Sequence, residues 1–232
     1  MTKFEKHILI VAGGDGKRLS NSVPKQFLLL RGRPILFHAI NSFLFLKEVT
    51  FTVVLSANQI DYWKSICSSK DFNIPHNIAE GGPTRFHSVK SGLKNIPDDS
   101  LVLIHDASRP FVSKETIMRV IEMATQKGNA IPVIEVNDSY REVSGNNNKI
   151  VARDKLRAVQ TPQTFHSSII KNAYNQAYNE IFTDDASVLE STGKQINIVK
   201  GNSENIKIST PVDLVVGEGI LDYTNRFKEE VD

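Results

Sequence analysis

The stretch that decides the fold is residues 8–19, which have the sequence ILIVAGGDGKRL. Its first five residues are apolar, which is typical of a strand buried on both faces of a parallel sheet. The glycines that follow allow the backbone to approach a ligand closely, and successive amides there can form a cradle for an anion. The stretch therefore predicts a buried strand followed by a ligand-binding loop.

Short apolar runs alternate with helical patterns from this strand onward. Further strands are predicted at 51–55, 77–79, 101–104 and 130–136, and helices at 34–46, 59–69, 84–93 and 113–126. This alternation predicts an α/β fold with a mostly parallel, twisted sheet, right-handed crossovers and flanking helices.

The pattern changes at residue 139, where two extended segments flank the turn sequence SGNNN at 144–148. Such a pattern predicts a β-hairpin. Because its side chains are polar and an isolated hairpin is marginally stable in water, we expect residues 139–153 to form a protruding arm that packs on a second subunit. The alternative is a surface hairpin folded onto its own domain.

The later part of the chain returns to the alternating pattern. Helices are predicted at 167–178 and 186–191, strands at 196–199 and 206–208, and a final helix after the capping box Thr210-Pro211-Val212-Asp213. We expect residues 1–232 to form one domain with the arm inserted.

Composition excludes several classes of protein. The 28 basic and 26 acidic residues nearly cancel, which argues against a broad nucleic-acid surface but leaves room for a local positive pocket. The lone cysteine, Cys67, excludes a disulfide framework and a cysteine-rich zinc site and fits a reducing compartment. No apolar run approaches the roughly 18 residues of a membrane span. We therefore expect a cytoplasmic protein that binds neither nucleic acid nor membrane.

Two familiar interpretations of the glycine loop fail. Leu19 stands where a dinucleotide-binding fingerprint needs its third glycine, which disfavours a dehydrogenase, and Arg18 stands where a P-loop needs serine or threonine. What remains is a glycine loop accompanied by two cations, Arg18 and Lys25, which favours phosphate binding. In nucleotidyl transfer, positioned cations stabilise the charge that develops on the α-phosphate and on the leaving pyrophosphate.

Two later clusters add candidate ligand-binding groups. In residues 81–88, Gly81 and Gly82 permit close backbone approach to a flat base, although a plain helix-start turn is the alternative. Residues 105–110 directly follow a buried strand, and ligands of open α/β sheets bind beyond the carboxyl ends of strands. Asp106 is therefore well placed to hold a metal ion or ribose hydroxyls.

Seven motifs occur in order along the chain. They are AGGxGxR at 12–18, PKQ at 24–26, GGxxRxxSV at 81–89, HDAxRP at 105–110, TPQ at 161–163, TDDAS at 183–187 and NIK at 205–207. From about residue 7 to 222 the chain resembles the 2-C-methyl-D-erythritol 4-phosphate cytidylyltransferase family. The resemblance implies a Rossmann-like nucleotidyltransferase fold, a homodimer with exchanged arms, and transfer of the cytidylyl group of CTP to methylerythritol phosphate with release of pyrophosphate.

The resemblance also implies roles for individual residues. Arg18 and Lys25 would be the catalytic residues that stabilise the pentacoordinate transition state. Nucleotide-binding residues would be Ala12, Gly13, Gly14, Gly16, Gly81, Gly82, Ser88 and Asp106. The sugar phosphate would be held by Arg109, Ser139, Arg153, Thr161, Thr183 and Lys207, with Arg153 acting in the partner's site. Mg²⁺ would bridge the triphosphate, with Asp106 as a candidate additional ligand.

Two alternative functions stay open at this point. Gly13 stands where the family usually has alanine, a feature shared with ribitol-5-phosphate cytidylyltransferases, so ribitol 5-phosphate is the alternative acceptor. In a different class, the chain could be a nucleotide-binding module without catalysis. The presence of both Arg18 and Lys25 disfavours that module, because binding alone does not require the pair.

Overall fold

The computed structural model describes residues 4–14 and 23–229. The strands are β1 (Lys6–Val11), β2 (Leu29–Leu30), β3 (Arg33–Pro34), β4 (Val49–Leu55), β5 (Asn77–Glu80), β6 (Leu101–Asp106), β7 (Asn129–Glu135), β8 (Tyr140–Ser144), β9 (Asn147–Val151), β10 (Arg157–Val159), β11 (Gln163–His166) and β12 (Ile198–Lys200). The α-helices are α1 (Ile35–Asn41), α2 (Ile60–Ser69), α3 (Arg85–Leu93), α4 (Lys114–Lys127), α5 (Ser167–Ala173), α6 (Asp185–Glu190) and α7 (Pro211–Glu229). Short 3₁₀ turns are η1 (Lys25–Phe27), η2 (Ala57–Gln59) and η3 (Arg153–Lys155).

The main sheet has the order β10-β7-β11-β6-β1-β4-β5, with β12 beside β7. Strand β1 pairs in parallel with β4 on one side and β6 on the other, so that Val11 lies opposite both Val54 and Asp106. This register brings the carboxyl ends of three parallel strands to one edge. The predicted α/β fold with a mostly parallel sheet is confirmed.

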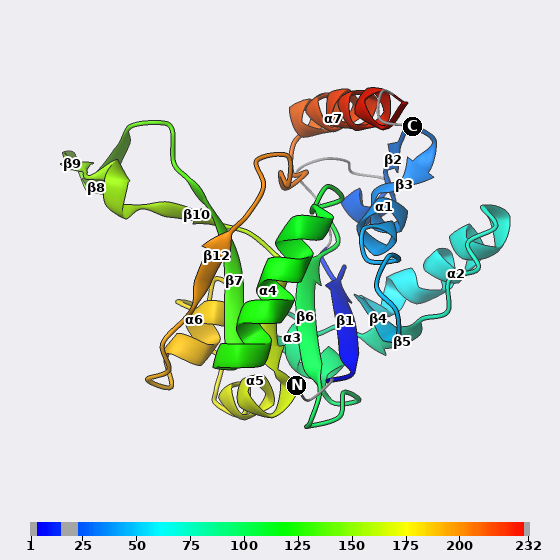
Figure 1. Cartoon of the computed structure of the whole chain (residues 1–232), viewed down its shortest axis with the longest axis horizontal. Helices are drawn as coiled ribbons and strands as arrows, with labels where there is room; N and C mark the ends of the chain where they lie inside the picture. The colour runs from blue at the N-terminus through cyan, green and yellow to red at the C-terminus, as the bar shows by residue number, and fades with distance from the viewer. Residues whose placement is uncertain (1–3, 15–22, 230–232) are drawn as a thin grey trace.

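Alternate residues of the central strands face two separate cores, as the period of two in a strand requires. In β1, Ile8 and Ile10 pack into the core under α1, α2 and α4, whereas Leu9 packs into the core under α3, α5 and α6. Figure 1 shows α4 in front of the sheet and α3 behind it. Burial on both faces explains why β1 is apolar throughout its middle.

Three sequence predictions about this fold are wrong in detail. The helices predicted at 34–46 and 167–178 are shorter, and end at Asn41 and Ala173. Ser42 is the C-cap of α1, and its hydroxyl lies 3.1 Å from the carbonyl oxygens of both His38 and Pro110, so that it can donate its proton to either. No strand forms at 206–208; instead Ile208 is buried and its N–H donates to the carbonyl of Ser108 across a loop.

Two antiparallel strands, β10 and β11, were not predicted from the sequence. Strand β11 inserts between β6 and β7 and is antiparallel to both, and β10 pairs antiparallel with β7. Both strands are short and carry polar residues, so their pairing depends on contacts distant in sequence rather than on local pattern.

The predicted hairpin arm is present as β8 and β9, joined through Gly145 and Asn146. Gly145 has a φ of +56°, a left-handed conformation that glycine adopts without strain. The arm projects away from the sheet and its helices in Figure 1. Every residue of β8 is exposed, so the hairpin does not fold onto its own domain.

Candidate functional site

A cavity of about 420 Å³ opens at the carboxyl edge of β1, β4 and β6. Its lining comes from Val11, Ala12, Gly13, Gly14, Lys25, Gln26, Ser56, Gly82, Pro83, Thr84, Arg85, Ser88, Asp106, Ala107, Ser108 and Lys207. Both glycine clusters predicted from the sequence therefore meet at the edge where ligands of α/β sheets bind.

The first wall of the cavity is the glycine loop after β1, together with η1. Gln26 is buried, and its Nε2 donates to the carbonyl oxygen of Ala12 at 2.6 Å and to Oε1 of Gln59 at 2.7 Å. Phe27 is also buried, with its ring stacked on Trp63 at 5.9 Å between centroids. These contacts fix η1, and with it Lys25, against the start of the glycine loop.

The second wall is the loop before α3. A Cβ on Gly82 would lie 2.4 Å from Cβ of His87, so only glycine fits at this position. The Gly82 N–H donates to Oγ of Ser88 at 3.1 Å, and Thr84 caps α3 by accepting from the backbone N–H of His87. The loop is therefore held tightly enough to present backbone atoms to a ligand.

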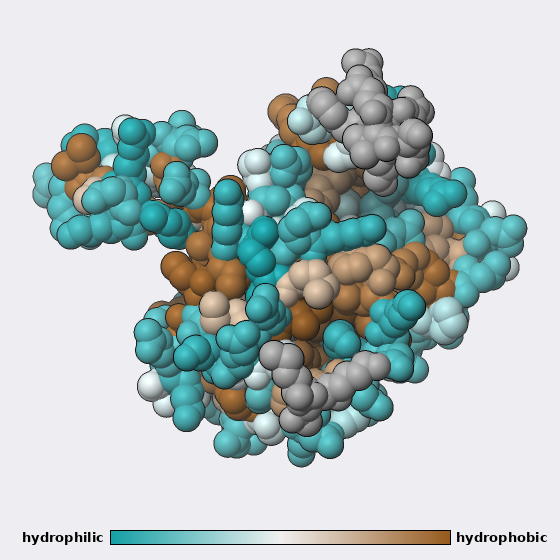
Figure 2. Space-filling view, viewed as in Figure 1, coloured by the Kyte–Doolittle hydropathy of each residue, from teal (hydrophilic) through white to brown (hydrophobic). Residues whose placement is uncertain are grey.

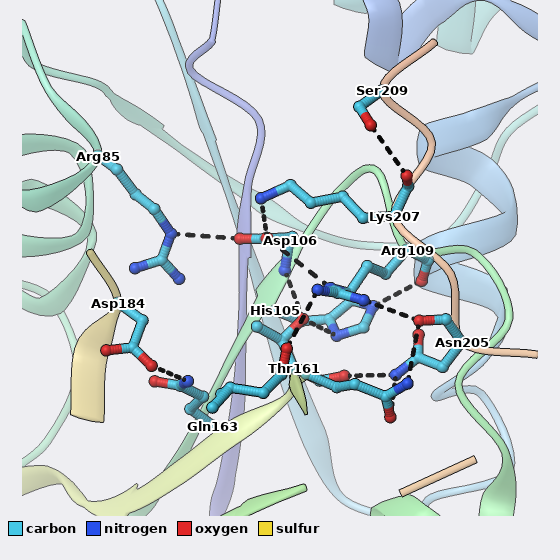
Figure 3. Close-up of polar contacts among 12 residues, drawn as sticks. Arg85, His105, Asp106, Arg109, Thr161, Gln163, Asp184, Asn205, Lys207 and Ser209 are labelled. Carbon is cyan, nitrogen blue, oxygen red and sulfur yellow. Dashed lines mark hydrogen bonds and ion pairs between the residues drawn. The ribbon is translucent and has the colours of Figure 1, made fainter. Parts of the chain in front are cut away.

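Asp106 lies on the cavity surface among three cations, as Figure 3 shows. Its Oδ1 accepts from Arg85 Nε at 3.2 Å, its Oδ2 accepts from Lys207 Nζ at 2.7 Å, and Arg109 Nε lies 4.0 Å away. Burial by itself would raise the pKa of Asp106, but these cations hold it well below its usual range. The carboxylate is thus charged. The charged residues of the described cavity lining are three cations, Lys25, Arg85 and Lys207, and one acid, Asp106.

His105 and Thr161 form a buried pair beside Asp106. A carbonyl can only accept, so His105 Nε2 donates to the Arg109 carbonyl at 2.8 Å and its Nδ1 accepts from the Thr161 hydroxyl at 2.9 Å. Burial lowers the pKa of His105 to about 4, which agrees with a neutral ring. Thr161 Oγ1 also accepts from the Asp106 N–H at 3.1 Å. Toward any ligand, Thr161 therefore retains only acceptor capacity.

Not every predicted site residue lies in the cavity. Gly81, Arg109 and Thr161 are not among the described lining residues. The Gly81 N–H donates to the carbonyl of Leu55, and Arg109 donates to the carbonyl of Asn205. Thr183 is exposed just before α6. Ser139 and Arg153 are exposed at the base of the arm, where Arg153 lines a different hollow. The predicted Gly16 and Arg18 lie outside the described residues.

The predicted metal ligand is not part of a preformed metal site. Both oxygens of Asp106 are bonded to cations, and within residues 4–14 and 23–229 no three His, Cys, Asp or Glu side chains gather closely enough to hold an ion. In the same ranges, no helix has the length and apolar character needed to cross a bilayer.

Sequence reasoning missed the groups that organise the site. Arg85 donates through both Nη atoms to Asp185, and Gln163 bonds both Asp184 and the N–H of Ala186. Asp184 is the N-cap of α6 and Asp185 is its first residue, so both acids lie at the start of this helix. The buried partners of Arg85 and Gln26 lie 100 and 33 positions away along the chain, so no local pattern could identify them.

The fold and the cavity together are those of a Rossmann-like nucleotidyltransferase. Residues 6–223 match the family model described as 2-C-methyl-D-erythritol 4-phosphate cytidylyltransferase. The chain is 44% identical over 219 residues to the protein of that name from Phocaeicola vulgatus, covering 94% of this chain and 100% of the relative.

Solved structures agree with the sequence comparison. The 2-C-methyl-D-erythritol 4-phosphate cytidylyltransferase of Francisella tularensis aligns with a TM-score of 0.77 at 28% identity, covering 92% of this chain and 98% of that one. The 4-diphosphocytidyl-2C-methyl-D-erythritol synthase of Anaerococcus prevotii aligns with a TM-score of 0.80 at 25% identity, covering 94% and 96%. The chain belongs to the 2-C-methyl-D-erythritol 4-phosphate cytidylyltransferase family.

Proposed function

We propose that the protein transfers the cytidylyl group of CTP to 2-C-methyl-D-erythritol 4-phosphate, a step of the non-mevalonate route to isoprenoid precursors. An oxygen of the acceptor phosphate attacks the α-phosphorus of CTP, and the bond to pyrophosphate breaks as the new P–O bond forms. The product is 4-diphosphocytidyl-2-C-methyl-D-erythritol. The observation that carries this proposal is the cavity in which both glycine loops, Lys25 and Lys207 meet, in a chain that matches the family over residues 6–223.

In this proposal the nucleotide lies between the two walls of the cavity, the glycine loop after β1 and the loop before α3. The backbone of residues 12–14, with Gly81, Gly82 and Ser88, holds the cytosine and the triphosphate, and Asp106 faces the ribose. The close contact of Gly82 with His87 supports this assignment, because a side chain there would displace the loop. Gly16 is assigned to the same loop from the motif alone.

Lys25 and Arg18 act on the reacting phosphate as stabilisers of the pentacoordinate transition state. For Lys25 the support is its position in the cavity lining, on a turn fixed through Gln26 to the carbonyl of Ala12. A fixed cation costs no reorganisation when charge develops, which is the main source of rate in such transfers. Arg18 has this role from the motif.

The acceptor substrate, 2-C-methyl-D-erythritol 4-phosphate, is proposed to be held by Lys207, Arg109, Thr161 and Thr183. Lys207 is the most available of the cations around Asp106, since 44% of its side chain is exposed. It can therefore leave the carboxylate for a phosphate with little rearrangement.

Mg²⁺ is proposed to arrive with the triphosphate. Phosphate oxygens are ligands that this ion prefers, and the described side chains supply no cluster of their own. Turnover that persists after complete chelation of divalent ions would contradict this assignment.

A homodimer formed through the arm is proposed to complete each site. Val143 and Ile150 of the arm are 71% and 75% exposed, and Figure 2 shows apolar surface on the projecting arm. Ser139 and Arg153 at the base of the arm then serve the partner's cavity rather than their own. The proposed compartment is the cytoplasm, in keeping with the unpaired Cys67.

Pyrophosphate release with CTP tests the activity, with 2-C-methyl-D-erythritol 4-phosphate and ribitol 5-phosphate as competing acceptors. We expect faster turnover with the first. Faster turnover of ribitol 5-phosphate would overturn the choice of acceptor. Tight binding of CTP without turnover of either acceptor would instead favour the non-catalytic nucleotide-binding module.

A further inference from the structure

One guanidinium joins three elements that surround the cavity. Arg85, the first residue of α3, donates through Nη1 and Nη2 to the two oxygens of Asp185 at 2.9 and 2.7 Å. Its Nε donates to Asp106 at the end of β6, a contact drawn in Figure 3. The planar fork of arginine gives such a bidentate contact a fixed geometry, which a lysine cannot reproduce.

The carboxylate that accepts from Arg85 is that of Asp185, and its position is fixed by several hydrogen bonds. Asp185 is fully buried at the first position of α6, and the Tyr174 hydroxyl donates to its Oδ1 at 2.6 Å. Burial and the neighbouring carboxylate raise the pKa of Tyr174 well above its usual value, so the hydroxyl keeps its proton. The carboxylate thus has three donors and no alternative position.

The fork fixes the start of α6 relative to the nucleotide wall. Thr183, proposed to contact the acceptor, lies two residues before Asp185, while Gly82 and Ser88 flank Arg85 on α3 and its loop. A second tether acts on the same turn, because Gln163 donates to Asp184 at 2.8 Å and accepts from the N–H of Ala186 at 2.8 Å. Arg85 and Gln163 thus fix the start of α6 together, and Arg85 is the one of the two that ties this turn to Asp106.

We propose that Arg85 is a positioning residue: by holding the start of α6 against Asp106, it keeps Thr183 in place to contact the acceptor substrate. This proposal rests on the proposed function, because it assigns Thr183 to the acceptor side. A buried ion pair is poor evidence of stability by itself, whereas its fixed geometry suits the alignment of two substrates.

The decisive variant is Arg85→Lys, assayed for turnover with both substrates and for CTP binding by calorimetry. We expect the KM for the acceptor to rise about tenfold or more, since hydrogen bonds to a charged group are lost, while the Kd for CTP stays within twofold. Tyr174→Phe, whose side chain does not line the cavity, should raise the same KM by about two- to fivefold.

A double-mutant cycle links the effect to α6. If Arg85 acts through Thr183, the acceptor KM of the double variant Arg85→Lys, Thr183→Ala will rise less than the product of the single effects. Arg119→Lys is the control, because this arginine is likewise held by more than one hydrogen bond, to the carbonyl oxygen of Lys200 and to Oγ1 of Thr116, but lies outside the cavity lining. Its kinetics should equal those of the wild type.

The outcomes separate this proposal from the proposed function. No turnover by the wild-type protein would contradict the function itself. Wild-type turnover with an unchanged acceptor KM in Arg85→Lys would overturn the positioning role alone. A rise in the Kd for CTP that matches the rise in acceptor KM would identify Arg85 as a nucleotide ligand instead. If Arg85→Lys fails to fold, Tyr174→Phe decides by the same criterion.

Discussion

Two regions of the molecule, the carboxyl edge of the sheet with Asp185 and the arm with Ile150, differ sharply in how deeply their side chains are buried. Asp185 is fully buried and accepts hydrogen bonds from Arg85 and Tyr174, whereas Ile150 on the arm is 75% exposed. At the carboxyl edge of the sheet, Asp106 and Asp185 are thus paired with cations from distant segments, although within the described part of the chain Arg109 Nε and Asn205 Oδ1 are buried there without a hydrogen-bond partner. The arm is held by the pairing of β8 with β9 and by side-chain contacts across that pair, such as Lys149 with Glu142, and it leaves Val143 and Ile150 exposed.

The difference indicates which region needs a partner. A buried ionic network is complete within one chain, and losing one member leaves the others desolvated without compensation. An exposed hairpin contributes little to the stability of its own chain, and it is stabilised when it packs against another surface. The edge is expected to respond strongly to substitution and the arm weakly, except in assembly.

Asp185→Ala should cause the largest loss of stability. We expect the free energy of unfolding to fall by about 3–5 kcal/mol, because Arg85 and Tyr174 lose their shared acceptor. Urea unfolding followed by circular dichroism measures it. Asp61→Ala is the control, since this acid is exposed on α2, and it should change the free energy by less than about 0.5 kcal/mol. A loss below about 1 kcal/mol for Asp185→Ala would show that other contacts hold α6.

Lys25→Ala tests whether catalytic activity, like stability, is strongly reduced by a substitution at the carboxyl edge of the sheet. We expect turnover to fall by about 10²–10³-fold, while the Kd for CTP changes much less, because the cation acts mainly in the transition state. Steady-state kinetics and calorimetry measure the two effects. Lys64→Ala, an exposed lysine of α2, should behave as the wild type. Weakened CTP binding with unchanged turnover would contradict the role of Lys25.

The buried edge should also show itself in the pH dependence of stability. The pKa of His105 is about 4 in the folded protein and near 6.5 when exposed. The unfolded chain therefore binds this proton more readily, so the stabilisation is complete above pH 6.5 and decreases as pH falls toward 4, by on the order of 3 kcal/mol.

His105→Asn should flatten that dependence. Burial also lowers the pKa of His7 and His38, so a shallower slope of the same sign should remain between pH 6.5 and 4. Urea unfolding at a series of pH values measures the slope. Equal slopes in the variant and the wild type would contradict the assignment to His105.

The arm should give the smallest effect on the chain itself. The double variant Val143→Ser, Ile150→Ser is expected to change the free energy of unfolding of the monomer by less than about 1 kcal/mol and to dissociate the proposed dimer. Analytical ultracentrifugation measures the association. Val212→Ser, an equally exposed valine on α7, should leave the association unchanged. A wild-type protein that is already monomeric at micromolar concentration would contradict the dimer.

Local signals account for the elements that the sequence predicted well. The apolar run of β6, the helices predicted at 84–93 and 113–126, and the Gly/Asn turn of the arm each depend on residues close together in sequence. All three features are confirmed, and Thr84 and Ser113 cap the two helices. The capping box at the start of α7 is confirmed as well, with Asp213 accepting from the N–H of Thr210 at 2.7 Å. Strands β10 and β11 escaped prediction because their pairing partners are distant in sequence.

The sequence by itself determined the α/β class, the two glycine loops and the motifs that carry the family resemblance, since each is written within a short stretch. Only the tertiary structure decided that Asp106 is held by Arg85 and Lys207, and that Asp185 and Gln163 anchor the start of α6. The physical reason is that a charge loses its water on burial and must find its partner wherever the fold brings one, at separations of up to 101 residues here.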